Sequence, residues 1–150
     1  MATCSLTATE LDDVLAILHR LRPDAPPWII APTPAGERGV VLCGPAGCRV
    51  LIETAWSTPE CLLISGLLPA SPEGDFYPPC APITPAIAVA RTRGPRALAT
   101  AILHRLLPTY QPRLQAAQVR EHAHRDAVAR QDGHDPASPS ARLYCAADAA

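Results

Sequence analysis

The sequence contains no lysine, and all 13 of its basic residues are arginines. Aromatic residues make up 4% of it, so leucine, isoleucine, valine and 27 alanines must supply most of a core. This composition is typical of a GC-rich genome and indicates little about mechanism. The longest unbroken apolar runs are four or five residues, far shorter than a membrane span of about 20 residues.

The beginning of the chain also lacks the basic residues and the apolar stretch of about 7–15 residues that a secretory signal needs. We therefore expect a cytoplasmic protein with no membrane association, whose six cysteines stay reduced. The net charge is −1, but it is unevenly distributed. Residues 1–90 are acidic, whereas residues 91–130 hold eight arginines against Glu121 and Asp126. The pattern predicts a basic C-terminal helix on an acidic body.

Residues 5–21 are predicted to form the first helix, with Ser5, Thr7 or Thr9 as its N-cap. Its apolar residues recur at spacings of three and four, which indicates one buried stripe. That stripe contains Leu11, Val14, Leu15, Leu18 and Leu21. The prolines at positions 23, 26 and 27 end the helix.

Three strands are predicted at residues 39–43, 48–53 and 61–68, followed by a fourth at 87–91. The first two flank Gly44-Pro45-Ala46-Gly47, which is typical of a β-hairpin turn. Trp28-Ile29-Ile30 is a candidate for a further short strand, which Pro32 and Pro34 would close. Residues 69–82 are rich in proline and are predicted to be a loop carrying Phe76 and Tyr77, whose rings we expect to tuck against the body.

A second helix is predicted to open at Gly94-Pro95 and to bury a stripe that includes Leu98, Ile102 and Leu106. We expect Pro108 and Pro112 to kink or break it. The chain then divides into a compact domain (1–112), a polar helical extension (113–131) and a disordered tail (132–150). The predicted fold is α+β: a two-layer sandwich of an N-terminal helix, a three- or four-stranded antiparallel sheet, and a C-terminal helix with its extension.

The segment Ile87–Tyr110 resembles an uncharacterised family of small proteins from actinobacteria and their phages or integrated elements. The matching residues are Ile87, Val89, Arg93, Ala99, Ile102 and the sequence Arg105-Leu106-Leu107-Pro108 with Tyr110. The basic, alanine-rich extension after Tyr110 is also similar. The resemblance covers about a third of the chain and implies an actinobacterial or phage setting. Its motif consists of packing and turn residues and implies no activity.

Cysteine and histidine offer the residue types of a metal site but not its usual spacing. Cys43 and Cys48 bracket the hairpin turn with four residues between them, whereas zinc knuckles normally have two residues between thiolates. Cys61 and Cys80 would have to complete such a site. We favour small apolar thiols without metal, with a zinc site or a redox pair as alternatives. Similarly, His122, His124 and His134 are expected to be solvated, and His19 and His104 to lie at the boundary of the core.

No nucleophile motif, phosphate loop or paired carboxylate is evident, so we expect no enzyme activity and no cofactor. The arginines are the residues that best indicate a function. We predict binding residues at Arg91, Arg93, Arg96, Arg113 and Arg120. The leading hypothesis is an accessory protein that binds a protein partner or itself. The alternative is a nucleic-acid-binding module whose arginine-rich helix start contacts phosphates.

Overall fold

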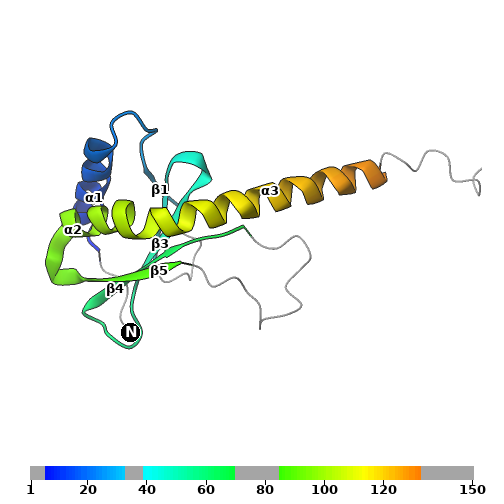
Figure 1. Ribbon diagram of the computed structural model, residues 1–150. Coiled ribbons are helices and arrows are strands. Elements are labelled where there is room, and N and C mark those ends of the chain that lie inside the picture. The colour runs from blue at the N-terminus through cyan, green and yellow to red at the C-terminus, as the bar shows by residue number, and fades with distance from the viewer. Residues whose placement is uncertain (1–5, 33–38, 70–84, 133–150) are drawn as a thin grey trace, which may run out of the picture.

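The computed structural model describes residues 6–32, 39–69 and 85–132 (Figure 1). It begins with helix α1 (Ala8–Leu21), followed by strands β1 (Ile29–Ala31) and β2 (Val40–Cys43) and a 3-10 turn, η1 (Pro45–Gly47). Strands β3 (Arg49–Thr54), β4 (Cys61–Gly66) and β5 (Ala86–Ala90) follow. The chain then continues through η3 (Arg91–Arg93), α2 (Gly94–Ala101), η4 (Ile102–Leu106) and α3 (Leu107–Asp132).

The five strands form one antiparallel sheet in the order β1-β2-β3-β4-β5. The prediction of an α+β fold is confirmed, but the predicted count of three or four strands is too low. The additional strand is β1, whose Ile30 pairs with Leu42 of β2. Its neighbouring prolines made the segment ambiguous in sequence, yet proline is compatible with an edge strand because one side of that strand needs no ladder partner.

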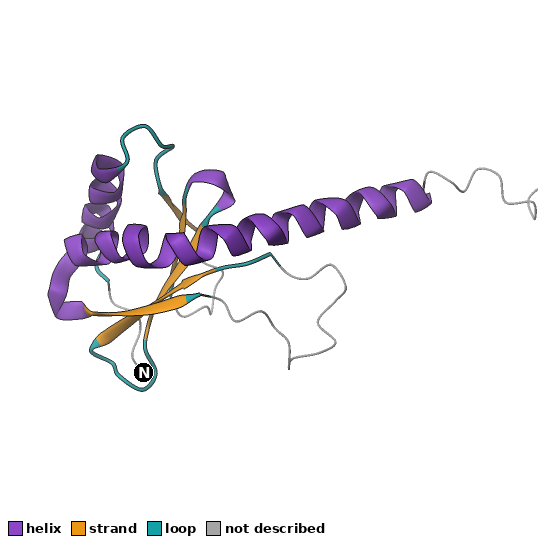
Figure 2. Ribbon diagram, in the orientation of Figure 1, coloured by secondary structure: helices purple, strands orange, loops and turns teal. Residues whose placement is uncertain are grey.

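All the helices lie on one face of the sheet, as Figure 2 shows, so the predicted two-layer arrangement is confirmed. Val50, Ile52 and Leu103 are buried between the layers, and Leu63 is half-buried on the opposite face. The core is almost entirely aliphatic. Its largest buried side chains are Tyr110, Leu18, Leu42, Ile52, Ile64, Leu98, Ile102 and Leu106.

Helix α1 begins with a capping box built on Thr7, one of the three predicted N-cap residues. The Thr7 backbone N–H donates to the Glu10 carboxylate (2.8 Å), and the Glu10 N–H donates to Thr7 Oγ1 (3.2 Å). Leu11, Val14 and Leu18 are buried as predicted. Leu21 is not, because the helix ends there and leaves its side chain 44% exposed.

Two aromatic rings lie directly on glycines, one in strand β4 and one in the turn that follows β2. The Tyr110 ring lies so close to Gly66 that an added Cβ would be 2.3 Å from it, and the Trp28 ring lies 2.6 Å from the corresponding position at Gly44. Any side chain at these positions would displace the ring. These glycines are therefore required because of the close approach of an aromatic neighbour.

Helices α2 and α3 join through η4, a π-helical segment, into one continuous rod (Figure 1). Pro108 and Pro112 were predicted to kink or break the helix, and of these two outcomes the break is wrong. The Leu107 N–H donates to the Ile102 carbonyl five residues back, which widens the turn just before Pro108. Pro108 and Pro112 are both exposed, so the carbonyls that they leave without a donor can face water.

Some of the predicted features fall outside the described residues. The Pro-rich loop with Phe76 and Tyr77 lies almost wholly within residues 70–84, and the predicted tail lies almost wholly within residues 133–150. Cys4, Cys80, Cys145 and His134 are also outside them. The boundary placed between residues 112 and 113 falls inside α3, whose Leu114 and Ala117 are still buried against the body.

Candidate functional site

The five arginines predicted to bind a partner do not share one surface. Arg91 and Arg93 lie in η3 and Arg96 in the first turn of α2, whereas Arg113 and Arg120 lie in α3. At a rise of 1.5 Å per residue, the helical rod separates Arg96 from Arg113 by about 25 Å. The sequence therefore contains two candidate surfaces at different places on the rod. We call Arg91, Arg93 and Arg96 the basic corner.

The basic corner surrounds the N-terminus of α2, which no side chain caps. All three arginines are exposed, and Gly94 adopts a positive φ of 77° that turns the chain into the helix. An acidic group lies close by. The pKa of Glu10 is lowered mainly by its hydrogen bonds from Thr7 and also by the charge of Arg91. The positive charge of the corner is therefore partly offset.

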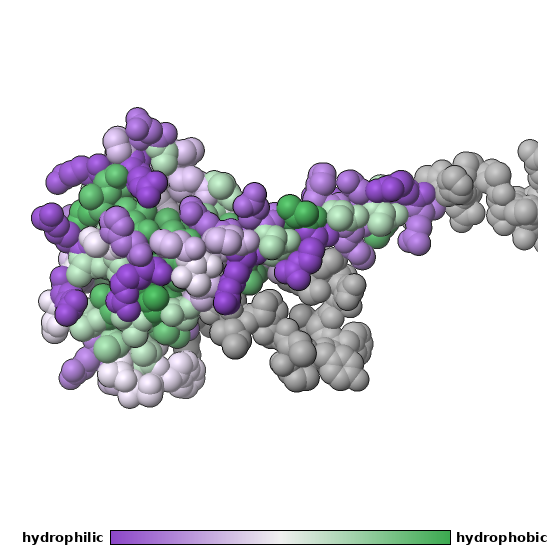
Figure 3. Space-filling model, viewed as in Figure 1, coloured by the Kyte–Doolittle hydropathy of each residue, from purple (hydrophilic) through white to green (hydrophobic). Residues whose placement is uncertain are grey.

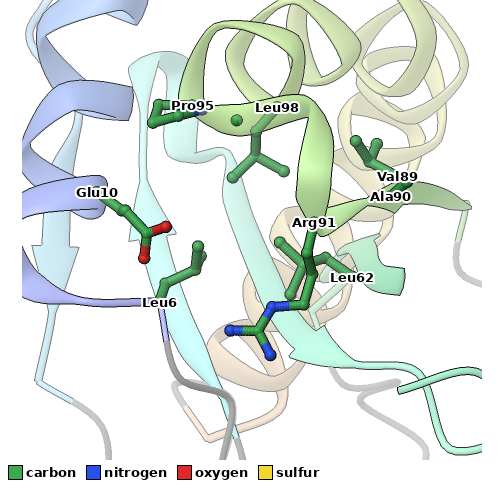
Figure 4. A pocket seen from close by; sticks show the side chains of 9 residues that line it. Leu6, Glu10, Leu62, Val89, Ala90, Arg91, Pro95 and Leu98 are labelled. Atoms are coloured by element: carbon green, nitrogen blue, oxygen red, sulfur yellow. The ribbon is translucent and has the colours of Figure 1, made fainter. Parts of the chain in front are cut away.

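Beside the corner, Glu10 of α1 and Arg91 of η3 flank a small cavity (Figure 4). Its remaining lining is mostly apolar and includes Leu6, Leu62 and Leu98. The cavity holds about 10 Å³, which is close to the space of a single water molecule. It is too small to receive an organic cofactor.

An exposed tryptophan, for which no role was predicted from the sequence, lies at the same end of the sheet. Trp56 is 82% exposed in the turn between β3 and β4. The Arg91 N–H donates to the Glu60 carbonyl (2.9 Å), which holds that turn against the start of η3. One feature of the sequence could have identified it: this tryptophan precedes Ser57-Thr58-Pro59 and belongs to no apolar pattern. Tyr110, the only phenylalanine, tyrosine or tryptophan between Arg91 and Arg130 in the sequence, is fully buried.

The second candidate surface is the far part of α3. Ala117 is the last buried residue of the helix, and the Gln118 side-chain amide donates to the Ala46 carbonyl (3.2 Å) of η1. We call residues 119–132 beyond this contact the arm. Val119 is 63% exposed and Val128 is 40% exposed, and Figure 1 shows the arm projecting from the body.

Polar and apolar side chains are interleaved along the arm (Figure 3). Arg125 and Glu121 form an ion pair within it (2.6 Å), and His122 lies 3.6 Å from Asp126. These pairs join residues four apart and support the helix itself. They explain how the arm stays helical without a packed face but give it no chemistry.

Where the arm leaves the body, an open groove of about 830 Å³ runs along α3. Its described lining is Leu68, Pro112, Arg113, Gln115, Ala116, Val119 and Arg120. Two of the predicted binding residues, Arg113 and Arg120, thus flank an apolar strip formed by Ala116 and Val119. This combination suits a segment that presents both apolar side chains and carboxylates.

The thiols do not converge. Cys48 is buried under the helices in the same core cluster as Trp28, and burial raises its pKa. Cys43 lies directly opposite Arg49 in the hairpin, so their side chains are on the same face of the sheet. Cys48 precedes Arg49 in the extended chain, so its side chain points to the other face. The thiols of Cys43 and Cys48 therefore lie on opposite faces of the sheet. Among the described residues, no three or more histidine, cysteine or acidic side chains are close enough to hold a metal ion.

Comparison of the chain with protein-family models, with curated proteins and with solved structures gave no match. Within the described ranges, no helix combines the length and the apolar character that crossing a bilayer requires. The two candidate surfaces are therefore the features of the molecule from which a function can be inferred.

Proposed function

We propose that this protein is a non-enzymatic accessory protein that acts by binding a protein partner through the arm and its adjoining groove. The observation that carries the proposal is the exposure of the arm: residues 119–131 are all exposed except the half-buried Glu121, and they include Val119 and Val128. A helix that buries no face on its own domain gains little from tertiary packing. A partner that covers it would supply that packing.

The groove indicates the chemistry of the partner. Val119 and Ala116 offer an apolar strip, and Arg120 extends a charged group beside it. An amphipathic helix with carboxylates along one border of its apolar face fits this pattern. Burial of the exposed Val119 side chain would add to the affinity, and the arginine would favour an acidic partner over a basic one.

The proposal is tested by placing a photo-activated cross-linking residue at position 119 of the full chain in cells of its own host. The matched control places it at Thr100, which is exposed on α2, away from the groove. We expect one protein adduct of defined mass from position 119 and none from position 100. Excess wild-type chain should compete the adduct away, whereas chain carrying Val119→Glu and Arg120→Glu should not. Equal competition by this variant would refute the proposal.

A second candidate function is nucleic-acid binding at the basic corner, which Trp56 favours. Its exposed ring offers a stacking surface at the same end of the sheet as Arg91, Arg93 and Arg96. Each base stacked on an aromatic side chain and each phosphate on an arginine would contribute to binding a single strand. The nearby carboxylate of Glu10 counts against a strong positive field.

Fluorescence anisotropy with single-stranded DNA and RNA at two salt concentrations tests this second candidate. Affinity should fall as salt rises, and replacing the three corner arginines with alanine should flatten the salt slope by about 1 for each arginine that binds a phosphate. The control replaces Arg113 and Arg120, about 25 Å or more along the rod, and should leave the slope unchanged. Absence of binding at low salt would eliminate this candidate.

We also propose an actinobacterial or phage setting and a cytoplasmic location. Support for the setting comes from the resemblance of Ile87–Tyr110 and from the lysine-free, arginine-rich composition. Support for the location comes from the thiols. Within the described ranges, Cys43, Cys48 and Cys61 are free thiols, which is compatible with a reducing compartment.

A further inference from the structure

Strand β5 (Ala86–Ala90) is the last strand of the sheet, and in the described part of the chain no strand pairs with its outer edge. Two hydrogen bonds establish which residues of β5 direct their backbone N–H and C=O groups toward β4. The Gly66 N–H donates to the Pro85 carbonyl (2.9 Å), and the Arg91 N–H donates to the Glu60 carbonyl (2.9 Å). Because bonding alternates along an antiparallel ladder, the backbone groups of Ala86, Ala88 and Ala90 point away from the sheet.

The two edges of this sheet differ in how well they are protected. β1 has only three residues and is followed at once by Pro32, which limits pairing with another strand. β5 has five residues and contains no charge and no proline. Natural sheets usually protect an edge with such residues, so an uncharged, regular edge strand is suited to pairing with another strand.

The sequence of β5 is symmetric about Ala88. It reads Ala-Ile-Ala-Val-Ala, so β-branched residues stand on both sides of the central alanine and alanines stand beyond them. A two-fold axis at Ala88 would place Ala88 opposite its own copy and Ile87 opposite Val89 of the second copy. Matched pairs of this kind stabilise antiparallel strands. An interface between identical copies requires this self-complementarity.

We propose that two copies of this chain pair through β5, antiparallel and centred on Ala88, to join their sheets. The outward backbone groups of Ala86, Ala88 and Ala90 then meet those of the second copy in hydrogen-bonded pairs. The half-buried Ile87 packs against Val89 of the other copy. The strand ends at Ala90, where η3 begins. Because Ala90 of one copy pairs with Ala86 of the other, η3 limits the pairing at both ends and so fixes its register.

The dimer is weak because its interface is short. Stable interfaces bury about 800 Å² on each partner, and two five-residue strands with alanine side chains cover less than that. We therefore expect a dimer whose population rises with protein concentration. The pairing uses no residue of the arm, so a result that refutes the dimer does not refute the proposed function, and the reverse also holds.

Sedimentation equilibrium of the full chain over a range of concentrations tests the pairing. Wild type should approach twice the mass of one chain at high concentration. Ala88→Glu and Ala88→Lys should each weaken the dimer by about tenfold or more, because each places like charges opposite one another at the axis. A mixture of the two variants should dimerise again, since unlike charges then meet. Only an axis through Ala88 predicts this recovery.

The matched control is Ile29→Glu, a similar charge on the other edge strand, where the side chain is 59% exposed. It should leave the dimer unchanged, and circular dichroism should show all variants folded. A wild-type chain that keeps the mass of one copy at every concentration overturns the proposal. So does an Ala88→Glu variant that dimerises as well as wild type, which would place the contact elsewhere.

Discussion

Tyr110 joins three parts of the protein through one side chain. Its ring covers Gly66 of β4, and its hydroxyl donates to the Leu67 carbonyl (2.5 Å) while accepting from the Arg49 N–H (3.1 Å). Burial raises the pKa of its phenol, so the hydroxyl stays protonated and able to donate. The residue therefore fixes α3 on the sheet shortly before the helix leaves it.

Replacing Tyr110 with phenylalanine keeps the ring but removes both hydrogen bonds. The Leu67 carbonyl and the Arg49 N–H are then left without this partner in a half-buried place, which should lower the free energy of unfolding by about 1–3 kcal/mol. Urea denaturation measures the change. A decrease within about 0.5 kcal/mol, the usual range for surface substitutions, would show that the hydroxyl does not anchor the helix.

Glu10 makes the stability of α1 depend on pH. Its pKa is lowered, chiefly by hydrogen bonds from Thr7, so its contribution is present above the ordinary pKa of about 4.3 and is lost as pH falls through the lowered value. Glu10→Gln should therefore be less stable than wild type at neutral pH and equally stable in strong acid. Thermal unfolding as a function of pH measures this. In a Thr7→Ala background the difference should shrink, and a constant difference at all pH values would contradict the capping box.

The sequence predicted residues of the core better than residues of the site. Val14, Leu18, Val50 and Ile52 lie at regular spacings, and such spacing depends only on the geometry of one helix or strand. The position of Trp56 near the basic corner and the closeness of Arg91 to Glu10 depend on which segments meet at one end of the sheet. That information lies in long-range pairing, which a local pattern does not contain.

At the scale of elements, the hairpin and the central strands follow from local chemistry, whereas the continuous rod does not. The local effect of a proline considers one position at a time, and it predicted a kink or a break at Pro108 and Pro112. The structure instead widens one turn at η4, and the buried residues Leu107, Tyr110 and Leu114 keep the helix against the sheet on both sides of Pro112. Tertiary packing outweighs the local cost.

Pro112→Ala tests whether α3 really continues through this position. Alanine restores a backbone donor and removes the ring from a helix interior, so the free energy of unfolding should rise, by up to about 3 kcal/mol. Chemical denaturation measures it, with Pro95→Ala as control, because proline at the first turn of a helix costs little. No gain at Pro112 would mean that the helix is interrupted there.

At the scale of the whole molecule, we expect the arm to contribute little to the stability of the body, because its described side chains are mostly exposed. In the described part of the chain, the last buried residue of α3 is Ala117, and Gln118, which directly precedes the arm, donates to the Ala46 carbonyl. Two shortened chains, ending after residue 132 and after residue 118, should therefore differ in free energy of unfolding by no more than about 0.5 kcal/mol. Calorimetry measures both. A larger decrease in the shorter chain would show that the arm is part of the folded domain.

The central claim is that the arm binds the partner, and the most direct measurement is the affinity of the cross-linked partner for three chains. These are the full chain, the chain ending after residue 132 and the chain ending after residue 118, each titrated by calorimetry. The first two should bind alike, which separates the arm from the residues after it. The third should bind at least about tenfold more weakly, a difference of about 1.4 kcal/mol. Equal affinity of all three chains would contradict the claim and place the binding surface on the domain.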